Sequence, residues 1–164
     1  MSYENILPCN YDTYGSSSAA VQLTTGGNPT RVYYQNVDGR IHELAGNGPL
    51  SSGYKDDVLA VAENPRVNTP IAVTTWNDFQ QIRVYYINER NEVIEAVYAS
   101  QTGWVPGAQN IGAAVPGSGL LWAVVDPAVG IRVGYQSVYA PGTITEALYS
   151  MSNEVWTTDN ANIY

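Results

Sequence analysis

The stretch IRVYYINERNEVIEAVYASQTGWVPG, residues 82–107, decides the fold, because two further versions of it occur in the chain. One version is TRVYYQNVDGRIHEL at 30–44, and the other is IRVGYQSVYAPGTITEALYSMSNEVW at 131–156. The same arginine returns at intervals of 52 and 49 residues, as Arg31, Arg83 and Arg132. Self-similarity at a period of roughly 20–50 residues is typical of repeat proteins, in which each repeat is one supersecondary unit. The chain of 164 residues therefore contains three related units.

Each unit is predicted to form four short strands. A strand-like run starts at the same interval before each arginine, as AAVQLT at 19–24, IAVTTW at 71–76 and LLWAVV at 120–125. This constant interval predicts one register for the first two strands of every unit. The third strand carries the pattern I-x-E, and a turn signal such as Asp38-Gly39 precedes it. A fourth strand is expected near the tryptophan that ends the second and third units.

Four-stranded units at this period indicate the blades of a β-propeller. We therefore predict an all-β fold, a β-propeller built from three four-stranded blades per chain, with repeats at about 18–66, 67–116 and 117–164. Residues 1–17 precede the repeats, and we expect an N-terminal extension that adds a latch strand to a blade edge. An open propeller leaves sheet edges that invite pairing with another chain. The prediction is a homodimer, or a higher homo-oligomer, that completes six blades.

The composition favours a neutral ligand. The chain carries 7 Lys plus Arg against 15 Asp plus Glu, a net charge of −8. A nucleic-acid binder needs a cationic surface that displaces counterions, and anionic membranes attract basic clusters in the same way. We therefore expect no nucleic-acid partner and no membrane insertion. Since the sequence has no zinc, nucleotide or nucleophile-elbow motif, we also expect no metal and no cofactor.

The N-terminal segment MSYENILPCNYD, residues 1–12, has neither a basic start nor a long apolar stretch. Secretory signal peptides have both features, so the prediction is a soluble protein that is cytoplasmic or secreted without a signal peptide. The single cysteine, Cys9, excludes an intrachain disulfide and is expected to be a small buried residue.

In each unit a glutamate follows the repeated arginine at nearly the same spacing, as Glu43, Glu95 and Glu146. On neighbouring antiparallel strands this separation brings the two side chains close together. Arg offers fixed donors and Glu offers acceptors, which suits the vicinal hydroxyls of a sugar. A cross-strand salt bridge, worth about 0–1 kcal/mol if exposed, explains the pair equally well. Both interpretations stay open on these residues alone.

Aromatic residues at nearly fixed distances from the glutamate favour the sugar. In the second unit, Tyr98 and Trp104 follow Glu95. In the third unit, Tyr149 and Trp156 follow the glutamate at the matching positions, with the tryptophan one position later. An aromatic ring covers the apolar C–H face of a sugar, and an indole N–H adds a donor.

Three other residues are expected to have structural roles. Trp76 and Trp122 lie in the first strands, near the expected core, so we predict that they pack between blades. His42 alternates with Glu43 along its strand and is expected on the other face, in a surface or packing role.

The phrases IRVYY, I-x-E and GWVPGA resemble the fungal and bacterial fucose-specific lectins of the Aleuria type, over about residues 18–160. The resemblance implies a six-bladed propeller with sugar sites between neighbouring blades, and a ring that small members assemble from several chains. It also implies that Arg and Glu of one blade hydrogen-bond the sugar, while aromatic residues of the next blade pack on its apolar face. The implied ligand is L-fucose or a fucosylated glycan.

Carried over to this sequence, the resemblance implies two sites of one kind. The first would consist of Arg31 and Glu43 with Tyr98 and Trp104 of the second blade. The second would consist of Arg83 and Glu95 with Tyr149 and Trp156 of the third blade, and with Gly107 and Ala108 of its own blade.

The third repeat departs from this pattern. A site that uses Arg132 and Glu146 would need its aromatic face from the partner chain. The first repeat, which would supply that face, has Gly46 where the second has its tyrosine, and no tryptophan in the region 50–54. Asp159 also stands near the position of Gly107. We therefore expect the third site to be weak or absent.

Two other classes of function compete with a lectin. A propeller glycosidase would need one pair of carboxylates with separate roles, whereas here one acid recurs in every repeat beside an arginine. A protein-interaction propeller without a sugar site explains the repeat and the acidic charge. It does not explain why Arg, Glu, Tyr and Trp recur together. The sequence therefore favours a binding protein that is not an enzyme.

Overall fold

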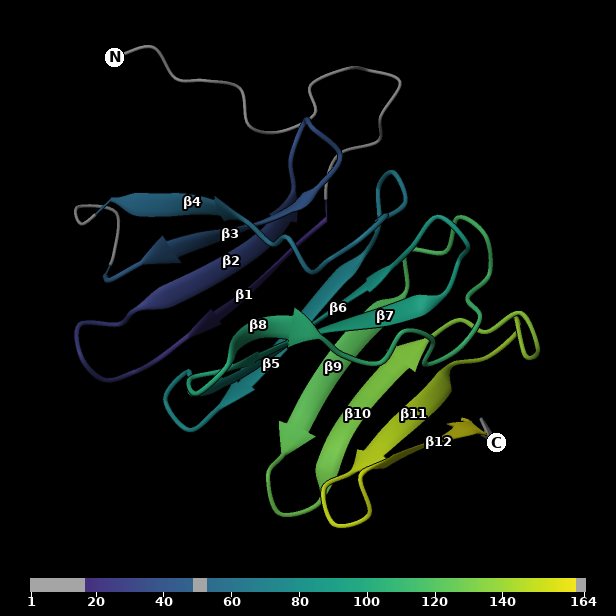
Figure 1. Cartoon of the computed structure of the whole chain (residues 1–164). Helices are drawn as coiled ribbons and strands as arrows, with labels where there is room; N and C mark the ends of the chain where they lie inside the picture. Colours follow the sequence, from purple (N-terminus) through teal and green to yellow (C-terminus); the bar gives the residue numbers. More distant parts are fainter. Residues whose placement is uncertain (1–16, 49–52, 162–164) are drawn as a thin grey trace.

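The computed structural model describes residues 17–48 and 53–161, which form three antiparallel sheets of four strands each (Figure 1). The first sheet contains β1 (Ser18–Gln22), β2 (Thr30–Gln35), β3 (Ile41–Gly46) and β4 (Tyr54–Val58). The second contains β5 (Ile71–Trp76), β6 (Gln81–Ile87), β7 (Val93–Ala99) and β8 (Gly103–Pro106). The third contains β9 (Leu121–Asp126), β10 (Gly130–Tyr135), β11 (Thr145–Ser150) and β12 (Val155–Asn160).

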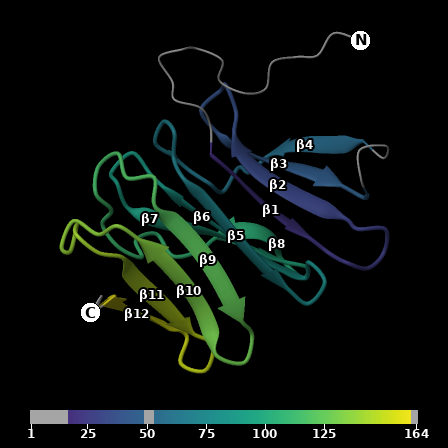
Figure 2. The same cartoon turned by 180° about the vertical axis from the view of Figure 1, so that it is seen from behind.

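Each sheet is a meander whose strands follow chain order, as expected for a propeller blade. The first strands lie side by side, since β5 contacts both β1 and β9, and the fourth strands lie at the outside (Figures 1 and 2). The described residues contain only strands, turns and loops, so the all-β prediction with three four-stranded units is confirmed. None of the described segments forms a helix long and apolar enough to cross a lipid bilayer.

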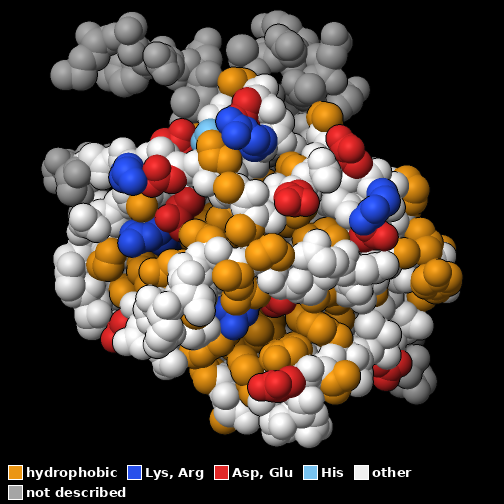
Figure 3. Space-filling view, in the orientation of Figure 1, with side chains coloured by type: hydrophobic (Ala, Val, Ile, Leu, Met, Phe, Trp, Pro, Cys, Tyr) orange, Lys and Arg blue, Asp and Glu red, His pale blue; other side chains and the backbone are white. Residues whose placement is uncertain are grey.

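Two hydrophobic clusters hold the sheets face to face. The cluster between the first and second sheets includes Tyr33, Ile41 and Val84, all fully buried. The cluster between the second and third sheets includes Tyr85 and Val133, also fully buried. Because side chains alternate along a strand, each sheet presents one face to the preceding blade and the other to the following blade. Figure 3 shows hydrophobic side chains gathered over the second and third sheets on one side of the molecule.

The prediction of one register for the first two strands is wrong. The residue opposite the repeated arginine is Val21, Thr74 or Val124, so the separation in sequence decreases by one position from each sheet to the next. The connection between the first two strands shortens along the chain, from 23–29 to 77–80 to 127–129. A shorter connection moves the partner strand closer in sequence, so a constant interval in sequence does not give a constant pairing.

Two predictions concern the chain ends and the division into repeats. The proposed latch strand and Cys9 lie in residues 1–16, outside the described residues. Ser17 is described, and its hydroxyl accepts a hydrogen bond from the backbone N–H of Ile71 at 3.3 Å. The repeat boundaries at 66 and 116 fall in loops between sheets. The division of the chain into three repeats at these positions remains a prediction.

The third sheet carries an exchange of large and small residues. The first two sheets pair a small residue on the first strand with a tyrosine on the second, as Ala19 with Tyr33 and Ala72 with Tyr85. In the third sheet Trp122 stands opposite Gly134. A Cβ atom on this glycine would clash with the indole ring of Trp122. The aromatic volume has therefore moved from the second strand to the first, and the glycine makes room for it.

This exchange predicts a compensating pair of substitutions. Gly134→Tyr alone should lower the free energy of unfolding by at least about 1–3 kcal/mol, because two rings would compete for one space. The double variant Trp122→Ala/Gly134→Tyr restores the arrangement of the other sheets and should recover most of the loss. Urea denaturation measures both. Gly119→Tyr is the control, since nothing lies within 4 Å of a Cβ at that position. A double variant less stable than Gly134→Tyr would contradict the exchange.

Candidate functional site

Four residues expected at the first site line one cavity between the first and second sheets. Arg31 and Glu43 come from β2 and β3, and Tyr98 and Trp104 come from β7 and β8. The cavity has a volume of about 420 Å³. Thus the structure brings together side chains that belong to two different repeats.

Arg31 and Glu43 are close without forming a tight ion pair. The Nε atom of Arg31 lies 4.0 Å from Oε1 of Glu43. The guanidinium instead donates from Nη1 to the backbone carbonyls of Thr30 at 3.0 Å and Gly46 at 3.4 Å. These contacts fix the arginine on its own sheet while some of its N–H groups stay available for a ligand.

The carboxylate of Glu43 is held from behind by a buried phenol. The hydroxyl of Tyr33 donates to Oε2 of Glu43 at 2.6 Å. Burial, followed by the nearby Glu43 carboxylate, raises the pKa of Tyr33 far above its ordinary value, so the phenol keeps its proton and acts as a donor. The other carboxylate oxygen is the one that lies 4.0 Å from Arg31, and the Glu43 side chain lines the cavity.

The aromatic wall of the cavity is a cross-strand pair. Tyr98 and Trp104 stand opposite each other on β7 and β8, and their ring centroids are 5.4 Å apart. Tyr33 meets Trp104 edge to face, with centroids 6.0 Å apart. This contact between blades holds the indole against the sheet that carries the arginine and glutamate.

The second site repeats the same plan between the second and third sheets. The Nε atom of Arg83 lies 3.8 Å from Oε1 of Glu95, and Tyr85 donates to the same carboxylate oxygen at 2.8 Å. Tyr149 and Trp156 stand opposite each other on β11 and β12, with ring centroids 5.4 Å apart. The Tyr85 ring meets Trp156 edge to face at 6.3 Å, as its counterpart does in the first site.

Gly107 and Ala108 lie beside the glutamate of the second site. The N–H of Ala108 donates to Oε2 of Glu95 at 3.1 Å. A Cβ atom on Gly107 would lie 2.5 Å from that same oxygen, so only glycine leaves room for the carboxylate. Glu95 therefore has a protein donor on each of its two oxygens, and it is the most buried of the three glutamates.

The third arginine and glutamate differ from the other two pairs. Arg132 donates from Nη2 to Oε2 of Glu146 at 2.7 Å, which is a direct ion pair. This contact, first by its hydrogen bond and then by the charge of Glu146, raises the pKa of Arg132. The arginine side chain is 52% exposed here, against 16% for Arg83. In the described chain no further sheet covers this face, and the glycine at 134 removes the phenol that holds the other glutamates.

The first sheet does contain an aromatic residue at the tryptophan position. Gly46 and Tyr54 stand opposite each other on β3 and β4, in the places that Tyr98 and Trp104 occupy in the second sheet. A Cβ atom on Gly46 would lie 2.7 Å from the Tyr54 ring. Sequence counting placed this position only within the region 50–54, because the connection before Tyr54 is longer than the corresponding connection of the second repeat.

Trp76, Trp122 and His42 partly match their expected structural roles. Trp76 packs against the second cluster, but its ring also lies 4.8 Å from the guanidinium carbon of Arg83. Trp122 lies 5.8 Å from that of Arg132, on the open face of the third sheet. His42 is buried on the face opposite to Glu43, between the carboxylates of Asp38 and Asp56 at 3.1 Å each.

Phe79 is a residue of the first site that sequence reasoning missed. It lies in the β5–β6 turn, and its ring centroid is 5.1 Å from the guanidinium carbon of Arg31. Phe79 is the only phenylalanine in the chain, but composition alone does not show where a side chain lies in the fold.

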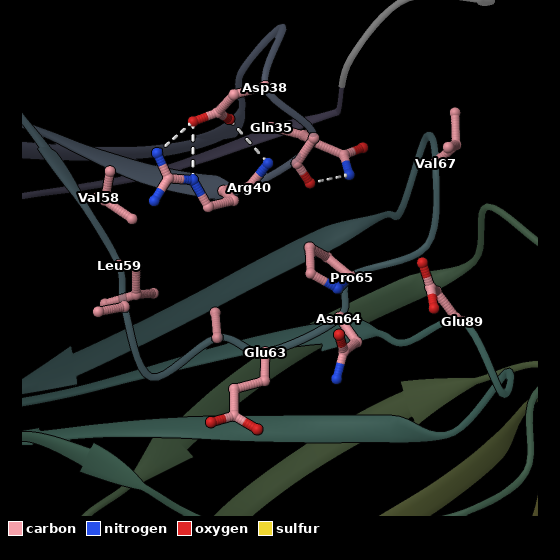
Figure 4. A pocket seen from close by; sticks show the side chains of 13 residues that line it. Gln35, Asp38, Arg40, Val58, Leu59, Glu63, Asn64, Pro65, Val67 and Glu89 are labelled. Carbon is pink, nitrogen blue, oxygen red and sulfur yellow. Dashed lines mark hydrogen bonds and ion pairs between the residues drawn. The ribbon is translucent and has the colours of Figure 1, made fainter.

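A larger cavity of about 530 Å³ lies at the opposite ends of the strands (Figure 4). It contains Asp38 and Arg40, which already form an ion pair at 2.8 Å, together with Glu63, Asn64 and Glu89. The described part of its lining has no aromatic ring, so it lacks the aromatic wall that both expected sites have. Among the described residues, no group of three or more His, Cys, Asp or Glu side chains is placed to hold a metal ion.

Comparison with known proteins finds both a family and structures that this chain resembles. A family model described as fungal fucose-specific lectin matches residues 13–113. The fucose-specific lectin of Aleuria aurantia is 33% identical over 79% of this chain and 44% of that protein, and that of Aspergillus fumigatus is 38% identical over 54% and 26%. The six-bladed β-propeller structure of the Aleuria aurantia lectin matches with a TM-score of 0.70 and 29% identity, over 88% of this chain and 48% of that one. The matched segments thus cover less than half the length of these relatives.

The buried phenols predict a loss of stability at alkaline pH. The pKa of Tyr33 is raised in the folded chain, so the folded state keeps a proton that the unfolded state loses above pH ~10. The stabilisation from each such phenol is complete below that pH and should fall by up to about 1.4 kcal/mol per pH unit above it. Urea unfolding at pH 9 to 11 measures this slope. Tyr33→Phe should make it shallower by the contribution of one phenol, since other buried tyrosines such as Tyr85 and Tyr86 also have a raised pKa. Tyr139→Phe, which changes an exposed ring, should leave the slope unchanged. Equal slopes in both variants would contradict the assignment.

Proposed function

Because the chain belongs to the fungal fucose-specific lectin family, we propose that it binds L-fucose or fucosylated glycans in the spaces between neighbouring blades. The observation that supports this most directly is that the same arrangement of side chains occurs twice in the chain. In both the first and second sites, an Arg and Glu on one sheet face a Tyr–Trp pair on the next. The relatives that match this chain are named fucose-specific lectins.

The polar groups suit a sugar that carries vicinal hydroxyls. Each hydroxyl both donates and accepts, so one hydroxyl accepts from the guanidinium of Arg31 while its neighbour donates to Glu43. Hydrogen bonds to charged groups are worth about 1.5–3 kcal/mol, more than those between neutral groups. Tyr33 holds the carboxylate before the sugar arrives, which lowers the entropy lost on binding.

The aromatic pair supplies the apolar part of the binding energy. Hydrogen bonds to a sugar replace bonds that the sugar already makes to water, so their net gain is small. Covering a C–H face or a methyl group by Trp104 removes apolar surface from water, at about 25 cal/mol per Å². Fucose is a 6-deoxy sugar and offers a methyl group for this contact.

The arrangement favours binding over catalysis. A glycosidase needs two carboxylates in separate roles on either side of the scissile bond. In the first cavity Glu43 is accompanied by Asp78, but the position equivalent to Asp78 at the second site is Pro127. A catalytic pair would thus be missing from one of two otherwise matching sites. Hydrolysis of an aryl fucoside would support the enzyme, and a glycan array without any signal would support a protein-interaction propeller.

Calorimetric titration with fucose tests the proposal and separates the two sites. Trp104→Ala should remove the first site, because it deletes the apolar wall opposite Arg31. The matched variant Trp156→Ala should remove the second site and spare the first. In each case we expect the stoichiometry to fall by one site per chain while the remaining site keeps its affinity. Loss of both sites in Trp104→Ala would show that this tryptophan holds the blades together instead.

We also propose that two copies of the chain complete a six-bladed ring. The open face of the third sheet carries Arg132 and Glu146, the polar half of a site. The open face of the first sheet carries Gly46 and Tyr54, at the positions of the aromatic half. These faces are complementary rather than identical, so the third blade of each copy would meet the first blade of the other. The third site, formed at this junction, has a tyrosine in place of a tryptophan and is expected to bind weakly.

Analytical ultracentrifugation at micromolar concentration tests this assembly. We expect a dimer of about twice 17.8 kDa. A charged residue on the open apolar surface, as in Val124→Glu, should shift the equilibrium towards monomer because Val124 is 47% exposed and lies on that face. Val37→Glu, an exposed change in the β2–β3 turn, is the control. A wild-type monomer under these conditions would contradict the proposal.

A further inference from the structure

The β5–β6 turn places polar groups at the rim of the first site. The cavity that contains Arg31 and Trp104 is also lined by Asp78 and Gln80 of this turn and by Ser100. None of these three belongs to the Arg, Glu, Tyr and Trp set that recurs in the repeats. All three are exposed and carry hydrogen-bonding side chains, so the cavity continues from the aromatic wall to a polar rim.

The backbone of this turn has an unusual conformation. Asn77, Asp78 and Phe79 have φ values of 52°, 52° and 64°, and Gln80 donates its N–H to the carbonyl of Asn77 at 2.9 Å. Two central residues with positive φ make a type I′ turn, which favours Asn and Gly and disfavours a bulky side chain. Phe79 nevertheless occupies this position and is buried in the first hydrophobic cluster, against Arg31. The contacts of its ring offset the strain and anchor Asp78 and Gln80 at the rim.

The matching turn at the second site has different chemistry. Val129 donates to the carbonyl of Asp126, and Met151 donates to the carbonyl of Val129, just as Gln80 donates to Asn77 and Ser100 to Gln80. The turns are therefore equivalent, and the three polar rim residues correspond to Pro127, Val129 and Met151. The second turn contains no non-glycine residue with positive φ, and all of its residues are described. The two sites thus have the same Arg, Glu, Tyr and Trp residues at their centres and differ in the residues at their rims.

We propose that Asp78, Gln80 and Ser100 form a second subsite for the hydroxyl-rich sugar that is linked to fucose in a glycan. This inference rests on the proposed function of the first site. A pyranose joined to the sugar held by Arg31 and Trp104 would extend to the rim, where the Asp78 carboxylate accepts from its hydroxyls. The amide of Gln80 and the hydroxyl of Ser100 offer both donors and acceptors. The first site therefore prefers a fucosylated disaccharide to fucose alone, and the second site does not.

Calorimetry on a chain with a single competent site tests the subsite. In the Trp156→Ala background, methyl α-L-fucoside is compared with two disaccharides, α-L-fucosyl-(1→2)-D-galactose and α-L-fucosyl-(1→6)-N-acetylglucosamine. We expect at least one disaccharide to bind about tenfold more tightly than the methyl fucoside, as one charge-assisted hydrogen bond provides. Adding Asp78→Ala should bring that ratio of affinities close to one. Adding Asp126→Ala, which removes an acid from the equivalent turn, should leave the ratio at its original value.

A reciprocal variant keeps the test independent of the Trp156→Ala background. Pro127→Asp with Val129→Gln and Met151→Ser introduces the complete polar rim at the second site, where Pro127 and Val129 are exposed and Met151 is partly buried. Measured in the Trp104→Ala background, this variant should gain a preference for the same disaccharide. Equal affinities for all three ligands at the wild-type first site would overturn the subsite while leaving fucose binding intact. Absence of methyl fucoside binding to the wild-type chain would overturn the proposed function itself, and the subsite with it.

Discussion

The alternation of side chains along each strand is the constraint on which the molecule depends. It gives every blade one face with Arg and Glu and an opposite face with the Tyr–Trp pair or its counterpart. When Tyr33 and Val84 pack between the first two sheets, these unlike faces meet, and a polar half and an aromatic half form one cavity. Neither half is complete on a single blade, so the site is a product of blade packing.

The three sheets share one arrangement of strands, but the side chains around their Arg–Glu pairs differ. Tyr33 and Tyr85 hold the first two glutamates through buried phenols, and Gly107 lets the second glutamate approach the backbone. In the third sheet Gly134 removes the phenol, while Trp122 fills the space and reaches Arg132. A repeat can thus preserve its aromatic volume and lose a hydrogen bond, because packing depends on volume whereas binding depends on the atoms that face the ligand.

The sequence alone predicts the parts of this structure that depend on recurrence. Three four-stranded sheets follow from residues repeated at nearly constant intervals. The meeting of Arg31 and Glu43 with Trp104 was implied by the family resemblance and not by the intervals. What depends on loop length was not predictable. The register of the first strands, the alignment of Tyr54 with the tryptophan position and the place of Phe79 are all set by connections that differ between repeats. These loops have no periodicity from which their geometry could be derived.

The ion pair between Arg132 and Glu146 makes the open face of the third sheet sensitive to ionic strength. Charges on an exposed surface are screened over about 8 Å at about 0.15 M salt, whereas buried pairs are screened much less. Arg83 and Glu95 are enclosed between two sheets, so added salt has little effect on them. At the open face, salt weakens the contact that occupies both charged groups and frees them for other partners. In a single copy of the chain, the ionic composition of the surroundings therefore acts mainly on this end and much less on the interior pairs.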